Sequence, residues 1–344
     1  MKKYMKAIGV GSLLLFGAAC GNSGGESSGS SDESSGSESS SGSEQNLRLA
    51  HNLGEDHPVH QGLVDFKDRV EENSDNMSVE IFPNGTLGSE NEVLEQVQNG
   101  GIDMTKVSAG ALENFASEYA VFSLPYIFED QEHFYNSMES EPVQELYQST
   151  EDQGFVGLTY YDSGARSFYT KDTPIKHPDD LQGLKIRVMD SQTQIDMVEQ
   201  MGGSPTPMPY GDIYTGLQQG VIDGAESNPT ALTNGNHGEV AKTFSYDEHT
   251  RIPDIVVMSA DTWNGLSSEQ QDIVKNAAEQ STETQKEIWA ETVEEAKTQA
   301  KEMGVEFYEV DKEPFREAVQ PMIEEYRQDE AVANLLDEFE ALRE

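Results

Sequence analysis

The sequence is poor in positive charge: 22 lysine and arginine residues face 64 acidic ones, and the net charge is −42. This imbalance argues against a nucleic-acid partner, because phosphate binding requires clustered basic side chains. It disfavours docking on an anionic membrane surface for the same reason. The hydrophobic fraction of 35% still allows a buried core, so the acidic residues must form an outer shell. Such a shell is typical of a protein from a salt-adapted organism, because screening by external salt weakens self-repulsion.

Cysteine is nearly absent, since Cys20 is the one cysteine in 344 residues. The chain therefore has neither a disulfide framework nor a catalytic thiol. Residues 1–19 have a basic start, an apolar stretch too short to span a membrane and a small-residue end. This pattern resembles a lipoprotein signal peptide and predicts that a lipid on Cys20 anchors the protein to the outer face of the cell membrane. An ordinary secretory signal with an incidental cysteine is the alternative.

Apolar residues are missing from residues 21–45, which consist mostly of serine, glycine and acidic residues. Such a segment cannot bury a core, so we expect residues 20–45 to act as a flexible tether behind the lipidated cysteine. The folded part then extends from about residue 46 to residue 344.

Strand and helix patterns alternate along the folded part. Residues 47–50 and 79–82 are typical of short strands, and residues 59–72 form a helical pattern with one apolar face. A capping box at residues 89–92 precedes a helix over 93–98. The fold class is therefore predicted to be α/β.

One segment is repeated. Residues 93–103 align without gaps on residues 213–223, and each copy predicts a helix, a glycine at its C-terminus and a strand opened by Ile-Asp. We interpret the repeat as two similarly built lobes. Ligands bind at the carboxyl ends of strands in open α/β sheets. Ser108, following the first copy, and Ser227 with Asn228, following the second, are therefore candidates for opposite walls of one cleft.

The C-terminal third is rich in helical patterns from residue 267 to residue 303. One continuous helix would be about 50 Å long and would brace both lobes. Two helices with a break near residues 281–284 are the alternative.

Sequence motifs of common enzymes are absent from the predicted folded part: within residues 46–344, Gly-x-Ser-x-Gly, Ser-x-x-Lys, a dinucleotide-binding glycine pattern and a phosphate loop are not found. Nothing in the sequence requires an enzyme or a cofactor.

Three histidines lie close together in the sequence: His51, His57 and His60. They suggest a competing hypothesis, that the protein is a metal-dependent extracellular hydrolase that uses this region with Glu90 or Glu92. No cysteine and no second histidine cluster completes a metal-ligand set. His51 directly follows the first predicted strand and is a candidate donor to a ligand hydroxyl.

Arginine occurs at eight positions, and two of them stand out. Arg187 interrupts the otherwise apolar strand pattern of residues 184–189, and Arg166 lies among aromatic residues. A guanidinium in such a place is either part of a buried structural ion pair or a bidentate clamp for a ligand carboxylate.

Four segments together resemble the DctP-type extracytoplasmic solute-binding proteins of tripartite ATP-independent periplasmic (TRAP) transporters. They are LRLAHNLGEDHPVH (47–60), IFPNGTLGSENEVLEQVQNGGID (81–103), LPY (124–126) and residues 180–228, which contain LQGLKIRVMDS and GGSPTPMPYGDIYTGLQQGVIDGAE. The resemblance covers the whole folded part.

The resemblance implies a two-lobed binding-protein fold with hinge strands and a long bracing C-terminal helix. Lobe I would comprise residues 46–165 and about 254–293, and lobe II residues 166–253 and about 294–344. It further implies a receptor, not an enzyme, that closes over a small organic acid and delivers it to a membrane permease driven by an ion gradient.

The resemblance also assigns roles to residues. Arg187 matches the arginine that binds the ligand carboxylate, and Arg166 matches a second arginine near the ligand. The complete set of predicted ligand-binding residues is Arg187, Arg166, Asn228, Ser227, Asp190, His51, Asn52, Ser108 and Glu90. Either Ser227 or Asn228 takes the place of a family asparagine. Ser108 replaces a longer polar residue of sialic-acid-binding relatives, which argues against that ligand.

Acidic and amide side chains that form hydrogen bonds with ligand hydroxyl groups favour a sugar acid, such as a uronate or an aldonate, as the ligand. A C4-dicarboxylate or a compatible solute such as ectoine remains the alternative ligand class.

Overall fold

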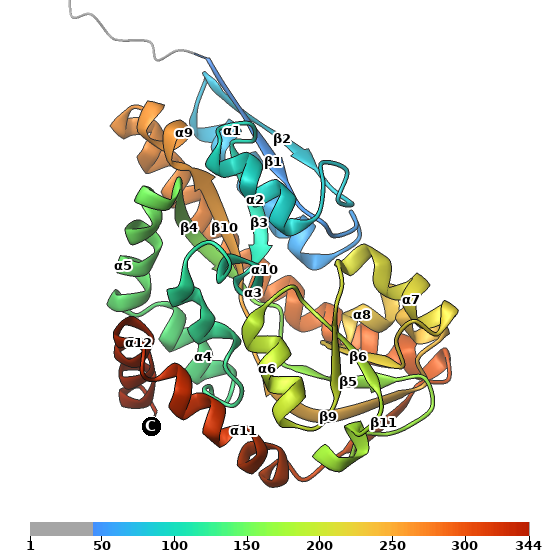
Figure 1. Cartoon of the computed structure of the whole chain (residues 1–344). Coiled ribbons are helices and arrows are strands. Elements are labelled where there is room, and N and C mark those ends of the chain that lie inside the picture. The colour runs from blue at the N-terminus through green and yellow to red at the C-terminus, as the bar shows by residue number, and fades with distance from the viewer. Residues whose placement is uncertain (1–43, 344) are drawn as a thin grey trace, which may run out of the picture. The chain divides into compact units, whose positions relative to one another are not determined.

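The computed structural model describes residues 44–343. The predicted signal peptide, the lipidation site Cys20 and nearly all of the tether therefore lie outside the described residues. Strands and helices alternate from β1 to α12, which confirms the predicted α/β class (Figure 1). Within residues 44–343, no helix is both long and apolar enough to cross a membrane.

The first sheet has five strands in the order β2-β1-β3-β10-β4. Their bounds are β1 Gln45–Ala50, β2 Met77–Phe82, β3 Met104–Ser108, β4 Phe155–Tyr161 and β10 Asp254–Ser259. Strand β1 runs parallel to β2 and β3, whereas β10 runs antiparallel to β3 and β4. The carboxyl ends of β1 and β3 therefore lie at the same edge of the sheet.

The second sheet has six strands in the order β11-β9-β5-β8-β6-β7. Their bounds are β5 Arg166–Thr170, β6 Lys185–Val188, β7 Ser204–Pro207, β8 Gly224–Ser227, β9 Thr243–Thr250 and β11 Glu306–Glu309. Strands β6, β7 and β8 are parallel, and β5 runs antiparallel to β8 and β9. Two sheets of this kind match the predicted two-lobed arrangement.

Helices connect most of the strands. The principal ones are α1 Pro58–Asn73, α2 Glu90–Gln98, α3 Ala109–Leu112, α4 Gln131–Met138, α5 Glu141–Ser149, α6 Gln192–Gln200, α7 Ile213–Gln219, α8 Thr230–Thr233, α9 Ala260–Gly265, α10 Ser268–Glu302, α11 Glu313–Tyr326 and α12 Glu330–Ala341. The predicted helices at 59–72 and 93–98 are confirmed as α1 and α2. Ser89 and Glu92 form the predicted capping box, which satisfies two backbone amides at the start of α2.

The repeated segment has the same structural role in both sheets. Asp103 Oδ2 accepts a hydrogen bond from the backbone N–H of Arg48 at 2.9 Å, and Asp223 Oδ2 accepts one from Lys185 at 2.9 Å. Each aspartate thereby ties the start of its own strand to a parallel neighbour. The strands β3 and β8 begin one residue after the aspartate, so the predicted opening by Ile-Asp was too early.

The long helix α10 is continuous over 35 residues, so the two-helix alternative was wrong. The polar residues at the predicted break are buried contacts instead. Ser281 Oγ lies 2.8 Å from the Tyr161 hydroxyl, and Thr282 Oγ1 lies 2.6 Å from Thr159 Oγ1 of β4. Helix α10 also packs against α1 and α8, which belong to different lobes, and thus braces both.

Three chain crossings join the sheets: residues 162–165 between β4 and β5, residues 251–253 between β9 and β10, and the segment with α9 and α10 between β10 and β11. Gly164 in the first crossing has a left-handed φ of 67°, and a Cβ there would lie 3.1 Å from Trp289 of α10. Glycine therefore permits both the turn and the close approach to the brace.

The exact lobe boundaries stay a prediction. Helix α12 packs against α4, α5 and the short 3₁₀ helix η1 (Ser117–Ser123), which belong to lobe I (Figure 1). These contacts favour assigning α12 to lobe I rather than to lobe II.

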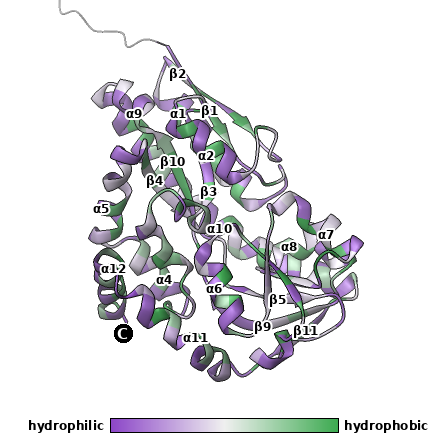
Figure 2. Ribbon diagram, viewed as in Figure 1, coloured by the Kyte–Doolittle hydropathy of each residue, from purple (hydrophilic) through white to green (hydrophobic). Residues whose placement is uncertain are grey.

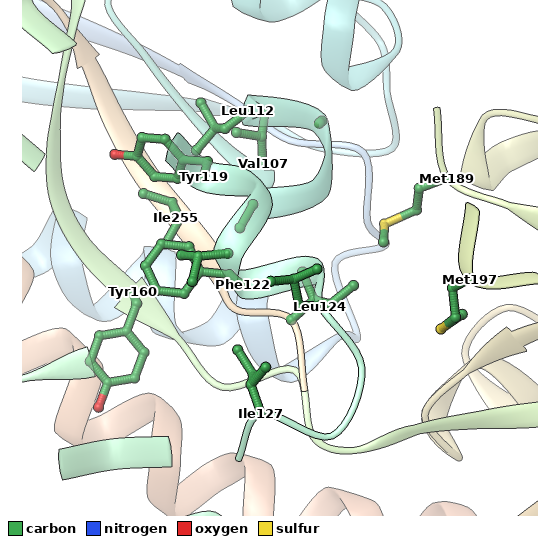
Figure 3. Packing of buried hydrophobic residues seen from close by; sticks show 14 of the residues in the cluster. Val107, Leu112, Tyr119, Phe122, Leu124, Ile127, Tyr160, Met189, Met197 and Ile255 are labelled. Atoms are coloured by element: carbon green, nitrogen blue, oxygen red, sulfur yellow. The ribbon is translucent and has the colours of Figure 1, made fainter. Parts of the chain in front are cut away.

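Hydrophobic side chains concentrate on the strands. In Figure 2, β10 is largely hydrophobic, whereas α9 and α11 have extended hydrophilic stretches. The largest buried cluster reaches from lobe I residues such as Phe122 and Ile255 to Met189 and Met197 in lobe II (Figure 3). The ends of the two sheets are therefore held close together around the cavities described next.

Candidate functional site

The carboxyl ends of strands from both sheets surround a small inner cavity of about 60 Å³. Its polar lining residues are Asn52, His57, Glu90, Lys106, Ser108, Ser163, Arg166, Arg187, Tyr210, Ser227, Asn228, Thr230 and Asp254. Seven of the nine predicted ligand-binding residues thus line one cavity; the other two are Asp190 and His51.

A larger outer cavity of about 540 Å³ adjoins the inner one. The two cavities share Asn52, Glu90, Arg187, Met189 and Tyr210 in their linings. Together the two cavities form one continuous space, with a polar inner end and a wider mouth. We call this space the cleft.

Arg187 lies on β6 and is 4% exposed. Its Nε donates to the carbonyl of Met208 at 2.9 Å. Among residues 44–343, its guanidinium forms no ion pair and its two terminal amino groups donate to no protein atom. Burial lowers the pKa of Arg187, yet arginine stays protonated because its ordinary pKa exceeds 12. A buried positive charge without an ion-pair partner among the described residues therefore faces the cleft.

Arg166, at the start of β5, is held differently. Its Nε and Nη2 donate to the two carboxylate oxygens of Glu226 at 2.6 and 2.9 Å, and Nη2 also donates to the Glu226 carbonyl. This bidentate pair is fully buried and neutralises the charge of Arg166. Nη1 is the group of Arg166 that is left to reach the cleft.

Two further buried groups, His249 and Asp247, act on Glu226: His249 contacts it directly, and Asp247 pairs with His249. His249 Nδ1 lies 2.6 Å from Asp247 Oδ2, and His249 Nε2 lies 3.5 Å from Glu226 Oε2. Burial opposes the charged imidazole, but Asp247 and Glu226 outweigh it and raise the pKa of His249 to about 9. Burial likewise opposes ionisation of Glu226, but Arg166 outweighs it and lowers the pKa of Glu226 to about 2. His249 is therefore protonated and Glu226 is ionised at neutral pH.

Lys106, on β3, presents a buried ammonium to the same cavity. Its Nζ lies 3.0 Å from Asp254 Oδ1, 3.3 Å from Asn52 Oδ1 and 3.5 Å from Glu90 Oε1. Burial opposes the charged form, but Asp254 and Glu90 outweigh it and raise the pKa of Lys106. The lysine is charged and neutralised within lobe I.

Ser108 and Asn228 have equivalent local roles. Ser108 Oγ accepts from the N–H of Gly110 at the start of α3, and Asn228 Oδ1 accepts from the N–H of Thr230 at the start of α8. The Asn228 amide nitrogen is left for a ligand, whereas its oxygen is engaged. Ser227 lines the inner cavity beside it.

Asp190 lies at the mouth of the cleft, outside the inner cavity. Its carboxylate accepts from Asn91 of lobe I at 2.7 Å, and its carbonyl accepts from Asn114 at 2.6 Å. Close by, Glu113 of lobe I accepts from the backbone N–H and the hydroxyl of Thr193 at the start of α6. These bonds connect the two lobes across the mouth.

His51 lines neither cavity, contrary to the expectation that it faces a ligand hydroxyl. Its Nδ1 accepts from the N–H of Leu53 and its Nε2 lies 3.0 Å from Nδ1 of His60 in the first turn of α1, so both ring nitrogens have partners outside the cavities. Burial lowers the pKa of His51 to about 2 and that of His57 to about 4, so both rings are neutral. The described residues hold no group of three or more His, Cys, Asp or Glu side chains placed to bind a metal ion.

Sequence reasoning missed Lys106, Asp254 and Ser163, which line the inner cavity. Lys106 had the same signal as Arg187, a lone basic residue in an apolar strand pattern. Asp254 had none, because it lies about 150 residues further along the chain and reaches Lys106 through the antiparallel pairing of β10 with β3.

Comparison with known proteins gives one consistent family. The model of bacterial extracellular solute-binding proteins of family 7, DctP, matches residues 49–329. The uncharacterized protein YiiZ of Salmonella typhimurium is 49% identical over 282 residues, which are 81% of this chain and 86% of that protein.

Two solved structures are similar throughout the described part. A TRAP periplasmic solute-binding protein of Anaerococcus prevotii with bound α/β-D-glucuronate has a TM-score of 0.85 and 38% identity, covering 87% of this chain and 98% of that one. A TRAP periplasmic solute-binding protein of Xanthobacter autotrophicus with bound β-D-galacturonate has a TM-score of 0.84 and 33% identity, covering 86% and 100%. The chain belongs to family 7 of the bacterial extracellular solute-binding proteins, the DctP family of TRAP transporters.

Proposed function

We propose that this chain is the solute receptor of a TRAP transporter and that it captures a uronate in the cleft between its lobes. The observation that carries the proposal is Arg187, whose buried guanidinium has no ion-pair partner among residues 44–343. The two solved relatives with bound D-glucuronate and D-galacturonate support the ligand class. A uronate has one carboxylate and several hydroxyl groups, which match one unpaired guanidinium and a polar lining.

In this proposal, the ligand carboxylate binds the two free amino groups of Arg187. Charge-assisted hydrogen bonds of this planar, bidentate type are stronger than neutral ones, and exclusion of water strengthens them further. Arg166 contributes a hydrogen bond through Nη1 but no net charge, because Glu226 neutralises it.

The ligand hydroxyls bind polar groups that line the inner cavity from both lobes. These are Asn52, Glu90, Ser108, Ser163 and Asp254 from lobe I and the crossing, and Ser227 and Asn228 from lobe II. Because a bound ligand touches both walls, it favours the joined arrangement of the lobes over a separated one. The permease would then recognise the joined form, and the chain itself performs no catalysis.

We further propose that the protein works outside the cytoplasm, attached through a lipid on Cys20. The support is the signal-like start of the sequence and the extracellular character of family 7. Fatty-acid labelling of the full chain in cells should depend on Cys20, and the C20S variant should be unlabelled and released from the membrane.

A thermal-shift screen in high salt tests the ligand class. The screen compares D-glucuronate, D-galacturonate, D-gluconate, succinate and ectoine, and we expect a uronate to raise the melting temperature most. A larger shift with succinate or ectoine would refute the ligand class. Stoichiometric zinc together with hydrolytic turnover would refute the receptor function and favour the hydrolase, which no observation on the described residues supports.

A further inference from the structure

We propose that Lys106, Asp254 and Glu90 make the cleft selective for monoanions, so that it binds a sugar acid with one carboxylate and rejects the corresponding dicarboxylate. This inference rests on the proposed function and deepens it, because both ligand types are organic acids that an arginine clamp alone would accept.

The charges around the inner cavity balance before any ligand binds. The cations are Lys106, Arg166 and Arg187, and the anions are Glu90, Asp254 and Glu226. His249 and Asp247 behind them form a further neutral pair. One bound carboxylate therefore finds a partner in Arg187, and a second carboxylate finds no unpaired cation among the described residues around the inner cavity.

Lys106 is the group that a second carboxylate would need. Its ammonium has three hydrogen atoms, and three protein oxygens, on Asp254, Asn52 and Glu90, lie 3.0 to 3.5 Å from Nζ. Its donors and its charge are thus already used within lobe I. A carboxylate placed here would meet the carboxylates of Asp254 and Glu90 instead of a free positive charge.

The same two carboxylates favour hydroxyl groups. Asp254 Oδ2 accepts from the Ser163 hydroxyl at 2.7 Å, and Glu90 Oε1 accepts from the N–H of Ser108 at 3.0 Å. Each carboxylate still has lone pairs that can accept from a ligand hydroxyl. The wall formed by lobe I therefore recognises a polyhydroxy segment and repels an anionic one.

Calorimetric titration tests this selectivity with D-gluconate and D-glucarate, which have the same carbon chain and differ at C6, where glucarate has a second carboxylate. D-Glucuronate serves as the monoanion in ring form. A buried carboxylate without a partner is strongly unfavourable, so glucarate should bind wild-type protein about a hundredfold or more weakly than the tighter of the two monoanions.

The decisive variant is Asp254→Asn, which removes one charge from Lys106 at nearly constant volume. Lys106 and Glu90 then form a neutral pair in place of a cation between two carboxylates, so the wall no longer repels an anion, and the dissociation constant of glucarate relative to the monoanion should fall by about tenfold or more. Glu90→Gln should act in the same direction with a smaller effect, because Glu90 is the more distant partner. Asp68→Asn, on the exposed side of α1, removes the same charge far from the cleft and should leave the ratio unchanged.

A gain in the affinity for glucarate relative to the monoanion cannot result from general damage to the site, because such damage would weaken the binding of both ligands. Equal affinity of wild-type protein for glucarate and the monoanion would overturn the inference while the sugar-acid function stands. An unchanged ratio in both Asp254→Asn and Glu90→Gln would also overturn it, because shape rather than charge would then exclude glucarate. Binding of none of these acids would refute the proposed function itself.

Discussion

Strands β3 and β8 have equivalent places in the two lobes, and the third residue of each is a buried charge of opposite sign. Lys106 on β3 pairs with Asp254 at 3.0 Å, and Glu226 on β8 pairs with Arg166 at 2.6 Å. Each lobe neutralises its own buried charge before the lobes meet. Among residues 44–343, this leaves Arg187 as a buried cation of the cleft without an ion-pair partner.

The two arginines of the cleft therefore differ in function although both are buried. Arg166 is part of a four-membered charged chain inside lobe II, and we expect its loss to affect folding. Arg187 is held by one hydrogen bond to a carbonyl, and we expect its loss to affect binding. Stability and affinity measured side by side separate these two roles.

The largest expected effect is on stability and concerns Arg166. Arg166→Leu should lower the free energy of unfolding by about 3–5 kcal/mol, because Glu226 is left buried without its partner. Denaturant unfolding of ligand-free protein measures this, and the double variant Arg166→Leu/Glu226→Leu should recover much of the loss. Wild-type stability in Arg166→Leu would contradict the structural role of this pair.

The next effect is a pH dependence that arises from His249. Its pKa in the folded protein is about 9 and its ordinary value is 6.5, so the folded state binds the proton more tightly. The resulting stability is fully present below about pH 6.5 and is lost as the pH rises through 9, on the order of 3 kcal/mol. Unfolding across this range should show the decline in wild type, and His249→Gln should flatten it.

The matched control is His177→Gln, which changes an exposed histidine and should keep the decline. A wild-type stability that is constant from pH 6.5 to 9 would show that His249 is neutral in the folded protein and that Glu226 relies on Arg166 alone.

The smallest effect concerns the contacts across the mouth. Glu113→Gln replaces the carboxylate that accepts from the N–H and the hydroxyl of Thr193 by an amide. The joined arrangement of the lobes should therefore lose about 1 kcal/mol, and ligand affinity should fall by roughly threefold to tenfold. Titration with the ligand identified in the screen measures this change. Glu132→Gln, an exposed change on α4, should have no effect, and equal affinities of both variants would show that Glu113 does not assist closure.

The sequence allowed most of the fold to be predicted, because the strands and helices follow apolar periodicity and capping residues that are local signals. The repeat at residues 93–103 and 213–223 indicated two related lobes correctly. Extending it by five residues would also have aligned Lys106 with Glu226 and Ser108 with Asn228, two of the equivalences that the structure contains.

The charge pairing could not be predicted in the same way. Arg166 is 60 residues from Glu226, and Lys106 is 148 residues from Asp254, so each pair depends on strand order and register rather than on local pattern. His51 was misjudged for a related reason, since its partner His60 comes from the turn of α1 that folds back on it.

The most direct test of the account is a calorimetric titration of the Arg187→Lys variant with D-glucuronate, beside a melt of the ligand-free protein. Lysine keeps the charge but loses the planar fork, so we expect the variant to bind about tenfold to a hundredfold more weakly than wild type, with a ligand-free melting temperature within a few degrees of it. Intact affinity together with a collapsed melting temperature would contradict the account, because Arg187 would then belong to the scaffold and the ligand carboxylate would have lost its proposed partner.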